Sequence, residues 1–119
     1  MTAQFDRTAA LIGESGLQTL RQKKVAVFGL GGVGSFAAEA LARAGIGSLL
    51  LVDKDVIEES NLNRQLYALH STVGQPKVEA ARARCLDINP ALRIDARREF
   101  YLSAGQIDIS DCDYVVDAI

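Results

Sequence analysis

A glycine-rich segment that directly follows a short apolar run constrains the fold of this chain more than any other feature. Residues 29–35 read Gly-Leu-Gly-Gly-Val-Gly-Ser, and the run before them, 25–28, is Val-Ala-Val-Phe. A strand that passes through glycines into a helix lets backbone N–H groups approach a phosphate closely. In this pattern Gly29 permits a tight turn, Gly31 leaves room for the phosphate, and Gly34 lets the helix pack against the strand. The segment therefore predicts a nucleotide-binding loop.

The composition is that of one globular domain. The chain has 119 residues, of which 49% are hydrophobic and 24% charged, as is typical of soluble proteins. The net charge of −2 gives no overall basic field for nucleic acid. No apolar stretch approaches the roughly 20 residues that a membrane span needs. The amino terminus also lacks the basic-then-apolar order of a secretory signal.

The cysteines and the single histidine suggest no metal site. Cys85 and Cys112 form neither a CxxC pair nor another metal-binding spacing, and we interpret them as structural thiols in a reduced, cytoplasmic setting. His70 has no acid or cysteine partner at catalytic spacing, so we interpret it as structural too.

Predicted helices and apolar strands alternate along the chain. Helices are expected over 6–22, 34–44 and 76–88, strands over 24–28, 48–52, 92–98 and 114–119, and one or two helical turns within 61–69. This alternation is typical of a parallel sheet with right-handed crossovers. We therefore expect an α/β fold, a Rossmann-like parallel sheet with flanking helices, truncated after about four strands. The nearly continuous apolar strand 48–52 should be buried on both faces.

Local signals set the expected helix ends. Gly45 is a C-cap candidate for the second helix, and Pro76 suits the first position of the third. Apolar residues Leu11, Leu17 and Leu20 mark the first helix, although Gly13 and Gly16 weaken its pattern. One face of the third helix should be apolar through Val78, Ala81, Cys85 and Ile88.

The last six residues, Tyr-Val-Val-Asp-Ala-Ile, stop inside an apolar strand pattern. Since a natural domain rarely ends in a strand that is central to its sheet, we expect a fragment of a longer protein. An edge strand here would expose unpaired backbone groups, which invites association.

Asp53 follows the second predicted strand and is a candidate ribose ligand. An acid at this position can accept hydrogen bonds from ribose hydroxyls. The alternative is a turn aspartate at a strand end. With only the glycines and this acid, NAD and ATP fit the sequence equally well.

A cluster of amides and a guanidinium favours ATP. Residues 60–65 read Ser-Asn-Leu-Asn-Arg-Gln. The planar fork of Arg64 matches phosphate oxygens, and amides can orient such oxygens or hold a hydrated metal. An oxidoreductase has no need of this cluster, whereas an enzyme that handles a triphosphate does. The alternative is a solvated polar turn with Ser60 as an N-cap.

Lys77 stands at the start of the predicted third helix, where a cation opposes the helix dipole at a cost of about 0.3–1 kcal/mol. Such a position makes sense beside an anion, and the alternative is an exposed lysine. For Arg7, in the first predicted helix, the plain interpretation is a solvated arginine. The arginines at 82, 84, 93, 97 and 98 are expected on solvated faces, with a weak basic patch as the alternative.

Four motifs occur together in a characteristic order and spacing. They are Gly-x-Gly-Gly-x-Gly-Ser, Asp53-x-Asp55, Asn61-x-Asn63-Arg64-Gln65 and Gly74-Gln-Pro-Lys77-Val-Glu. Together they resemble the adenylating superfamily of ubiquitin-activating enzymes and their bacterial relatives in thiamine and molybdopterin synthesis, over essentially the whole chain. Three further segments, which begin at Arg7, Ala38 and Asn63, resemble the tRNA threonylcarbamoyladenosine dehydratases, also called the cysteine desulfurase-associated family.

The resemblance implies that residues 1–119 are the N-terminal, ATP-binding part of a ThiF-type adenylation domain that uses ATP and Mg²⁺. It implies nucleotide-binding roles for Gly29, Gly31, Gly32, Gly34, Asp53, Asp55, Asn61, Asn63, Arg64, Gln65 and Lys77. Asp53 would hold the ribose, and Arg64 and Lys77 would act catalytically on the triphosphate. Arg7 would reach into the site of the partner subunit of a homodimer, as the third catalytic residue.

The implied chemistry is adenylation of a substrate carboxylate, in which positioning and charge neutralisation carry most of the step. In the dehydratase branch the substrate is the threonyl carboxylate of a modified tRNA adenine, and ring closure then expels AMP. A cysteine desulfurase system is an implied further partner. The alternative substrate is the C-terminus of a ubiquitin-like sulfur carrier, and a NAD-binding oxidoreductase is the less favoured reading. The zinc-binding CxxC pairs of the sulfur-carrier branch do not occur within these 119 residues, and in that branch they usually lie further along the chain.

The chain departs from the family pattern at its last residues. The family's strand ends in Asp-x-x-Asp, and here Asp117-Ala-Ile stops one residue before the second aspartate. That aspartate helps to bind metal and nucleotide in the family. We therefore expect this 119-residue chain to be weakly active at best.

Overall fold

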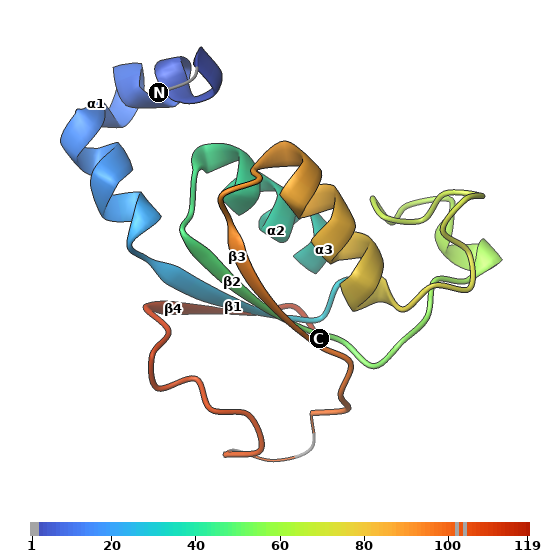
Figure 1. Cartoon of the computed structure of the whole chain (residues 1–119). Coiled ribbons are helices and arrows are strands. Elements are labelled where there is room, and N and C mark those ends of the chain that lie inside the picture. The colour runs from blue at the N-terminus through green and yellow to red at the C-terminus, as the bar shows by residue number, and fades with distance from the viewer. Residues whose placement is uncertain (1–2, 102, 104) are drawn as a thin grey trace.

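A computed structural model describes residues 3–101, 103 and 105–119. Within these residues the core is a four-stranded sheet in the order β3-β2-β1-β4 (Figure 1). The strands are β1 (Lys24–Phe28), β2 (Ser48–Val52), β3 (Arg93–Arg97) and β4 (Tyr114–Asp117). Every neighbouring pair is parallel. The predicted α/β, Rossmann-like sheet is therefore confirmed, and its carboxyl ends share one edge.

Two helices cover one face of the sheet. They are α2 (Gly34–Ala44) and α3 (Lys77–Ile88), and they lie side by side (Figure 1). Gly45 caps α2 with a left-handed backbone, as expected. Pro76, in contrast, lies just before α3 and not in its first turn, because its extended backbone forms an antiparallel bridge with Val56. In the predicted 61–69 region the structure has turns and the short 3₁₀ helix η2 (Glu59–Asn61).

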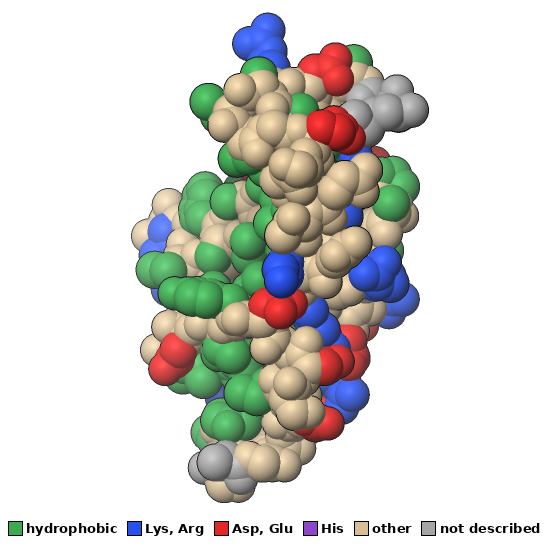
Figure 2. Space-filling model, turned by 90° about the vertical axis from the view of Figure 1, so that its left-hand side faces the viewer, with side chains coloured by type: hydrophobic (Ala, Val, Ile, Leu, Met, Phe, Trp, Pro, Cys, Tyr) green, Lys and Arg blue, Asp and Glu red, His purple; other side chains and the backbone are tan. Residues whose placement is uncertain are grey.

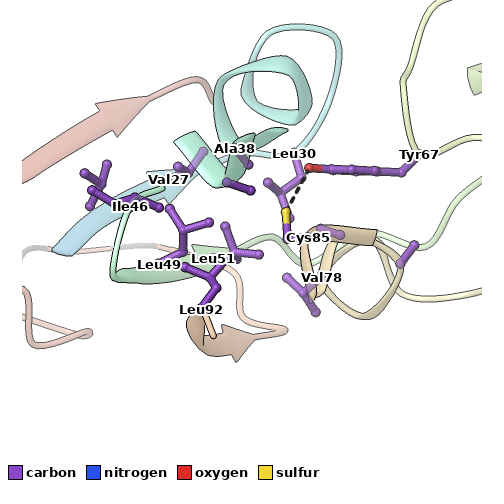
Figure 3. Packing of buried hydrophobic residues seen from close by; sticks show 14 of the residues in the cluster. Val27, Leu30, Ala38, Ile46, Leu49, Leu51, Tyr67, Val78, Cys85 and Leu92 are labelled. Atoms are coloured by element: carbon purple, nitrogen blue, oxygen red, sulfur yellow. Dashed lines mark hydrogen bonds between the residues drawn. The ribbon is translucent and has the colours of Figure 1, made fainter. Parts of the chain in front are cut away.

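The main core lies between the sheet and these helices (Figure 3). Leu49 and Leu51 of β2 contribute to it, together with Val78 and Cys85 of α3. The predicted apolar face of α3 is confirmed, since Val78, Ala81 and Cys85 are buried and Ile88 packs against the cluster. Full burial of a valine, leucine or isoleucine side chain contributes about 1.5–3 kcal/mol to stability.

The opposite face of the sheet is covered by the segment between β3 and β4, whose described residues form no helix or strand (Figure 1). Phe28, Leu50 and Val52 are buried there against Ile107, and Tyr101 packs at the margin. Strand β2 is thus buried on both faces, as its apolar sequence predicts. Strand β4 is more exposed, and the side chain of Tyr114 lies largely in solvent.

The N-terminal helix differs from its prediction. Helix α1 (Asp6–Arg21), which follows the 3₁₀ turn η1 (Ala3–Phe5), is interrupted at Gly13, where φ is 78° and ψ is 164°. The pattern of leucines indicated one continuous helix, but Leu17 is buried while Leu11 is 88% exposed. The glycine breaks the helix and leaves Leu11 without a packing surface in the described part of the chain.

The surface around α1 carries side chains of both charge signs. Figure 2 views the molecule from this side and shows hydrophobic side chains mainly on the left of the view, with acidic and basic side chains mixed together mainly toward the right. Within the described residues, every helix is too short or too polar to cross a lipid bilayer.

Candidate nucleotide-binding site

A pocket of about 250 Å³ lies at the carboxyl edge of the sheet. Its walls come from the segments after all four strands and from the start of α3. The lining residues are Gly29, Gly31, Val52, Asp53, Lys54, Asp55, Lys77, Glu99, Phe100, Tyr101, Ala118 and Ile119. Open parallel sheets bind ligands in crevices at this edge.

The glycine loop forms one wall, and two of its positions exclude any side chain. Gly29 has φ +92°, and a Cβ atom there would lie 2.6 Å from the carbonyl oxygen of Ala118. A Cβ at Gly34 would lie 1.6 Å from the carbonyl oxygen of Gly29, so only glycine lets α2 begin this close to β1. Gly31 lines the pocket, and Gly32 is exposed at the loop tip with no atom near its missing side chain.

Asp53 joins the glycine loop to the end of β2. Its Oδ2 accepts a hydrogen bond from the backbone N–H of Leu30 at 2.7 Å. Its Oδ1 accepts one from the N–H of Asp55, also at 2.7 Å. A carboxylate has about four acceptor sites, so each oxygen keeps capacity for a further donor such as a ribose hydroxyl.

Lys77 is buried, which excludes the alternative of an exposed lysine. The residue is 7% exposed, and its Nζ lies 4.0 Å from Oδ2 of Asp55. The other oxygen of Asp55 accepts a 2.8 Å hydrogen bond from Lys54 Nζ. This hydrogen bond raises the pKa of the Lys54 ammonium. The pocket therefore presents two ammonium groups that share one carboxylate.

The cluster of residues 61–65 does not line this pocket. The Asn61 Oδ1 accepts the N–H of Glu58 in a capping box, so Glu58 is the N-cap and the alternative of a Ser60 cap is wrong. Arg64 is exposed, and its Nη1 donates to Asn63 Oδ1 and to the carbonyl of Ser60. The structure thus uses these polar groups to hold a turn.

Gln65 is the member of the cluster that reaches the glycine loop. Its Nε2 lies 3.5 Å from the position that a Cβ would take on Gly31. The turn that begins at Asn61 is therefore adjacent to the nucleotide loop, although Arg64 hydrogen-bonds to Asn63 and does not line the pocket.

Arg7 and His70 lie outside the pocket. Arg7 is exposed in α1, which leads into the amino end of β1, whereas the pocket is at the carboxyl end (Figure 1). His70 is exposed in the turns before α3. Among the described residues there is no group of three or more His, Cys, Asp or Glu side chains placed to hold a metal ion.

The sequence reasoning missed an aromatic wall after β3. The Phe100 ring lies 5.3 Å from Lys54 Nζ, within cation–π range. The Tyr101 ring packs edge-on against Phe28 with centroids 4.8 Å apart. Phe100 and Tyr101 follow the strand predicted over 92–98. This aromatic pair could have indicated the wall, because parallel sheets bind ligands at the carboxyl ends of their strands.

The family model described as the ThiF family matches residues 5–119. This chain belongs to the ThiF family. It is similar to the tRNA threonylcarbamoyladenosine dehydratase of Bacillus subtilis, with 54% identical residues over 120 positions. The alignment covers 99% of this chain and 47% of the B. subtilis protein. The chain thus spans about half the length of the curated relatives that it matches. The predicted resemblance to the dehydratase branch is confirmed.

Solved structures of the Escherichia coli dehydratase TcdA have the same fold. The structure in complex with AMP matches at a TM-score of 0.94 and 42% identity, covering 98% of this ThiF-family chain and 48% of that one. The complex with ATP matches at a TM-score of 0.87 and covers 98% and 49% of the two chains. Both ligands named for these relatives are adenine nucleotides.

Proposed function

We propose that the complete protein is an ATP-dependent adenylating enzyme and that residues 1–119 form the N-terminal, ATP-binding part of its ThiF-type domain. One observation carries the proposal: a glycine loop fastened by Asp53 and a buried lysine, Lys77, line the same pocket at the carboxyl edge of the sheet. The adenine nucleotides bound to the E. coli relative support ATP over NAD.

The residues of the pocket fit a nucleotide. Gly29 and Gly31 line the pocket without side chains, and the loop opens α2, whose N-terminal N–H groups favour an anion. Asp53 would accept the ribose hydroxyls, and Lys77 would neutralise phosphate charge. Mg²⁺ would be held largely by phosphate oxygens and water, since it takes few protein ligands in such sites.

The remaining predicted site residues do not line the pocket, so their roles would need a side-chain movement or a second subunit. Asn61, Asn63 and Gln65 would support the loop from the adjacent turn, and Arg64 would turn from Asn63 toward the triphosphate. Arg7 would reach the site of a second subunit in a homodimer. These roles rest on the family resemblance together with the position of Gln65 beside Gly31.

The proposed substrate is threonylcarbamoyladenosine in tRNA, as the names of the relatives suggest. A carboxylate oxygen of the threonyl group would attack the α-phosphorus of ATP, and the bond to the bridging oxygen would break to release pyrophosphate. Attack by the carbamoyl group on the activated carbonyl would then close a ring and release AMP. Lys77 and the loop N–H groups would stabilise the charge that develops on the phosphate.

We place this reaction in the cytoplasm, because Cys85 and Cys112 are both free thiols, as reducing compartments favour. A cysteine desulfurase system is a proposed partner by resemblance alone. The surface of mixed charge seen in Figure 2 supplies no independent support for tRNA binding.

Nucleotide preference is tested by thermal denaturation of the full-length protein with Mg-ATP and with NAD. Because a ligand that binds only the folded state stabilises it, Mg-ATP should raise the melting temperature and NAD should not. Stabilisation by NAD alone would overturn the proposal. AMP release that depends on tRNA containing threonylcarbamoyladenosine, and not on a ubiquitin-like sulfur carrier, would establish the acceptor.

The role of Lys77 is tested by Lys77→Met against the matched surface variant Lys23→Met. Loss of a charged hydrogen-bond donor should weaken ATP binding by about 10- to 100-fold. Lys23 is 47% exposed in its side chain and does not line the pocket, so its variant should bind ATP as the wild type does. Equal affinities for the two variants would contradict the assignment.

A further inference from the structure

Three charged side chains that line the pocket lie close together at unequal distances, and they belong to Lys54, Asp55 and Lys77. Asp55 Oδ1 is 2.8 Å from Lys54 Nζ, whereas Asp55 Oδ2 is 4.0 Å from Lys77 Nζ. Hydrogen bonds to an ammonium require a much shorter approach than 4.0 Å. The carboxylate is therefore hydrogen-bonded to Lys54 and only loosely paired with Lys77.

The two lysines differ in their need for a partner. The side chain of Lys77 is 8% exposed, and that of Lys54 is 50% exposed. A buried ammonium is costly unless it is paired. Among the described residues, the long contact to Asp55 is the one ion pair that Lys77 makes. The buried lysine is thus the one left with capacity for an anion.

Lys54 is held in place by two contacts besides Asp55. Its Nζ lies 5.3 Å from the centroid of the Phe100 ring, and its backbone carbonyl accepts a 3.5 Å hydrogen bond from Arg98 Nε. Both partners belong to the segment after β3. This segment therefore fixes the ammonium beside Asp55, although the side chain is half exposed.

We propose that Lys54 is a positioning residue for nucleotide binding, which engages the Asp55 carboxylate and so leaves the Lys77 ammonium free for a phosphate group. Without Lys54, the carboxylate would turn toward Lys77 and pair with it at hydrogen-bond distance. The uncompensated charge of Asp55 would also repel an incoming polyphosphate. Lys54 acts through these two neighbours and needs no contact with the nucleotide.

This inference rests on the proposed function and predicts a loss that depends on ligand charge. Titration calorimetry of the full-length protein would compare ATP, AMP and adenosine as ligands of Lys54→Gln. Removal of one half-exposed charge should weaken ATP binding by about three- to tenfold, AMP binding by less, and adenosine binding by no more than about twofold. The matched control is Lys23→Gln, which removes an equally exposed lysine outside the pocket.

Two further variants separate charge compensation from packing. Lys54→Arg keeps the cation beside Asp55 and above Phe100, and should bind ATP within about twofold of the wild type. In an Asp55→Asn background the carboxylate that would capture Lys77 is already gone, so adding Lys54→Gln there should weaken ATP binding by no more than about twofold. A full loss of about three- to tenfold in that background, or an equal loss for adenosine and ATP in Lys54→Gln alone, would overturn the inference.

The outcomes also distinguish the proposed function from the role of Lys54. A wild-type protein that binds no ATP would refute the proposed function itself. A wild-type protein that binds ATP, with Lys54→Gln and Lys23→Gln equal to it, would refute only the role of Lys54.

Discussion

The Asp53 carboxylate fastens the glycine loop to β2 through a 2.7 Å hydrogen bond from the N–H of Leu30. Leu30 is the second residue of the glycine segment, so the acid fixes the loop that follows β1. Because the other oxygen of Asp53 holds the N–H of Asp55, one side chain sets the positions of two walls of the pocket. A residue predicted to bind ribose therefore also has a structural role.

Substitution of Asp53 should cost stability as well as ligand affinity. Asp53→Ala leaves two backbone donors without their acceptor and should lower the free energy of unfolding by about 1–3 kcal/mol. Urea denaturation of the unliganded protein measures this loss. The control is Glu14→Gln, an exposed residue of α1, which should change stability by no more than about 0.5 kcal/mol. An unchanged free energy of unfolding for the Asp53→Ala variant would show that the glycine loop keeps its conformation without this carboxylate.

The glycines of the loop should differ sharply in their tolerance of alanine. Gly34→Ala places a Cβ within 1.6 Å of the carbonyl of Gly29, so the backbone must move and the protein should lose about 3 kcal/mol or more. Gly32→Ala meets no atom within 4 Å and should leave stability nearly unchanged. Thermal denaturation of the two variants without nucleotide tests the contrast, and similar melting temperatures would contradict it.

Glu39 should make stability depend on pH in the acid range. Its hydrogen bond with Arg84 is the main cause that lowers the Glu39 pKa below its usual 4.5, with a smaller contribution from Arg43. A depressed folded-state pKa stabilises the fold above the unfolded value, and that stability is lost as pH falls through the folded pKa. Glu39→Gln should therefore cost about 1 kcal/mol at neutral pH.

The stability difference between wild type and Glu39→Gln should shrink below about pH 4.5, because the carboxyl of the unfolded chain takes up a proton there while the folded protein still holds the carboxylate charged, and it should vanish at still lower pH. Urea midpoints of both proteins from pH 7 down to pH 3 measure it, and other acids cancel in the comparison. A difference that stays constant with pH would show that Glu39 acts by packing between α2 and α3 and not through its charge.

The two thiols should react at different rates. Burial raises the pKa of both thiols, but Cys85 is fully buried whereas Cys112 is partly exposed. Since the reagent must reach the sulfur atom, iodoacetamide should label Cys112 first and reach Cys85 only when the protein unfolds. Peptide mass spectrometry over a labelling time course gives both rates. Equal rates in native buffer would show that α3 opens readily.

Much of the fold was predictable because its signals are local. The apolar run of β2 and the cap at Gly45 each depend on a few consecutive residues. The start of α3 was displaced by one residue because Pro76 is engaged by Val56, a contact between distant parts of the chain. The sequence showed that Gly13 weakens the helix pattern, but it did not show that the residue adopts a φ of 78° and interrupts the helix.

The candidate site was predictable in part for the same reason. Gly29 and Asp53 directly follow strands and Lys77 begins α3, so their place at the carboxyl edge follows from the parallel topology. Arg64 was assigned to the triphosphate from its chemistry within the 60–65 cluster and from the family resemblance, and in the structure its guanidinium hydrogen-bonds to Asn63 in a turn. Side-chain direction depends on local packing and hydrogen bonds that motif spacing does not encode.

The sequence by itself determined the parallel sheet, the glycine loop and the acid at the end of β2, because periodicity and backbone sterics act over a few residues. Only the tertiary structure decided that Lys54 and Lys77 share the carboxylate of Asp55 while Phe100 lies over Lys54. Those contacts join segments after β2 and β3 to the start of α3. They arise from the packing of distant segments, which no local pattern specifies.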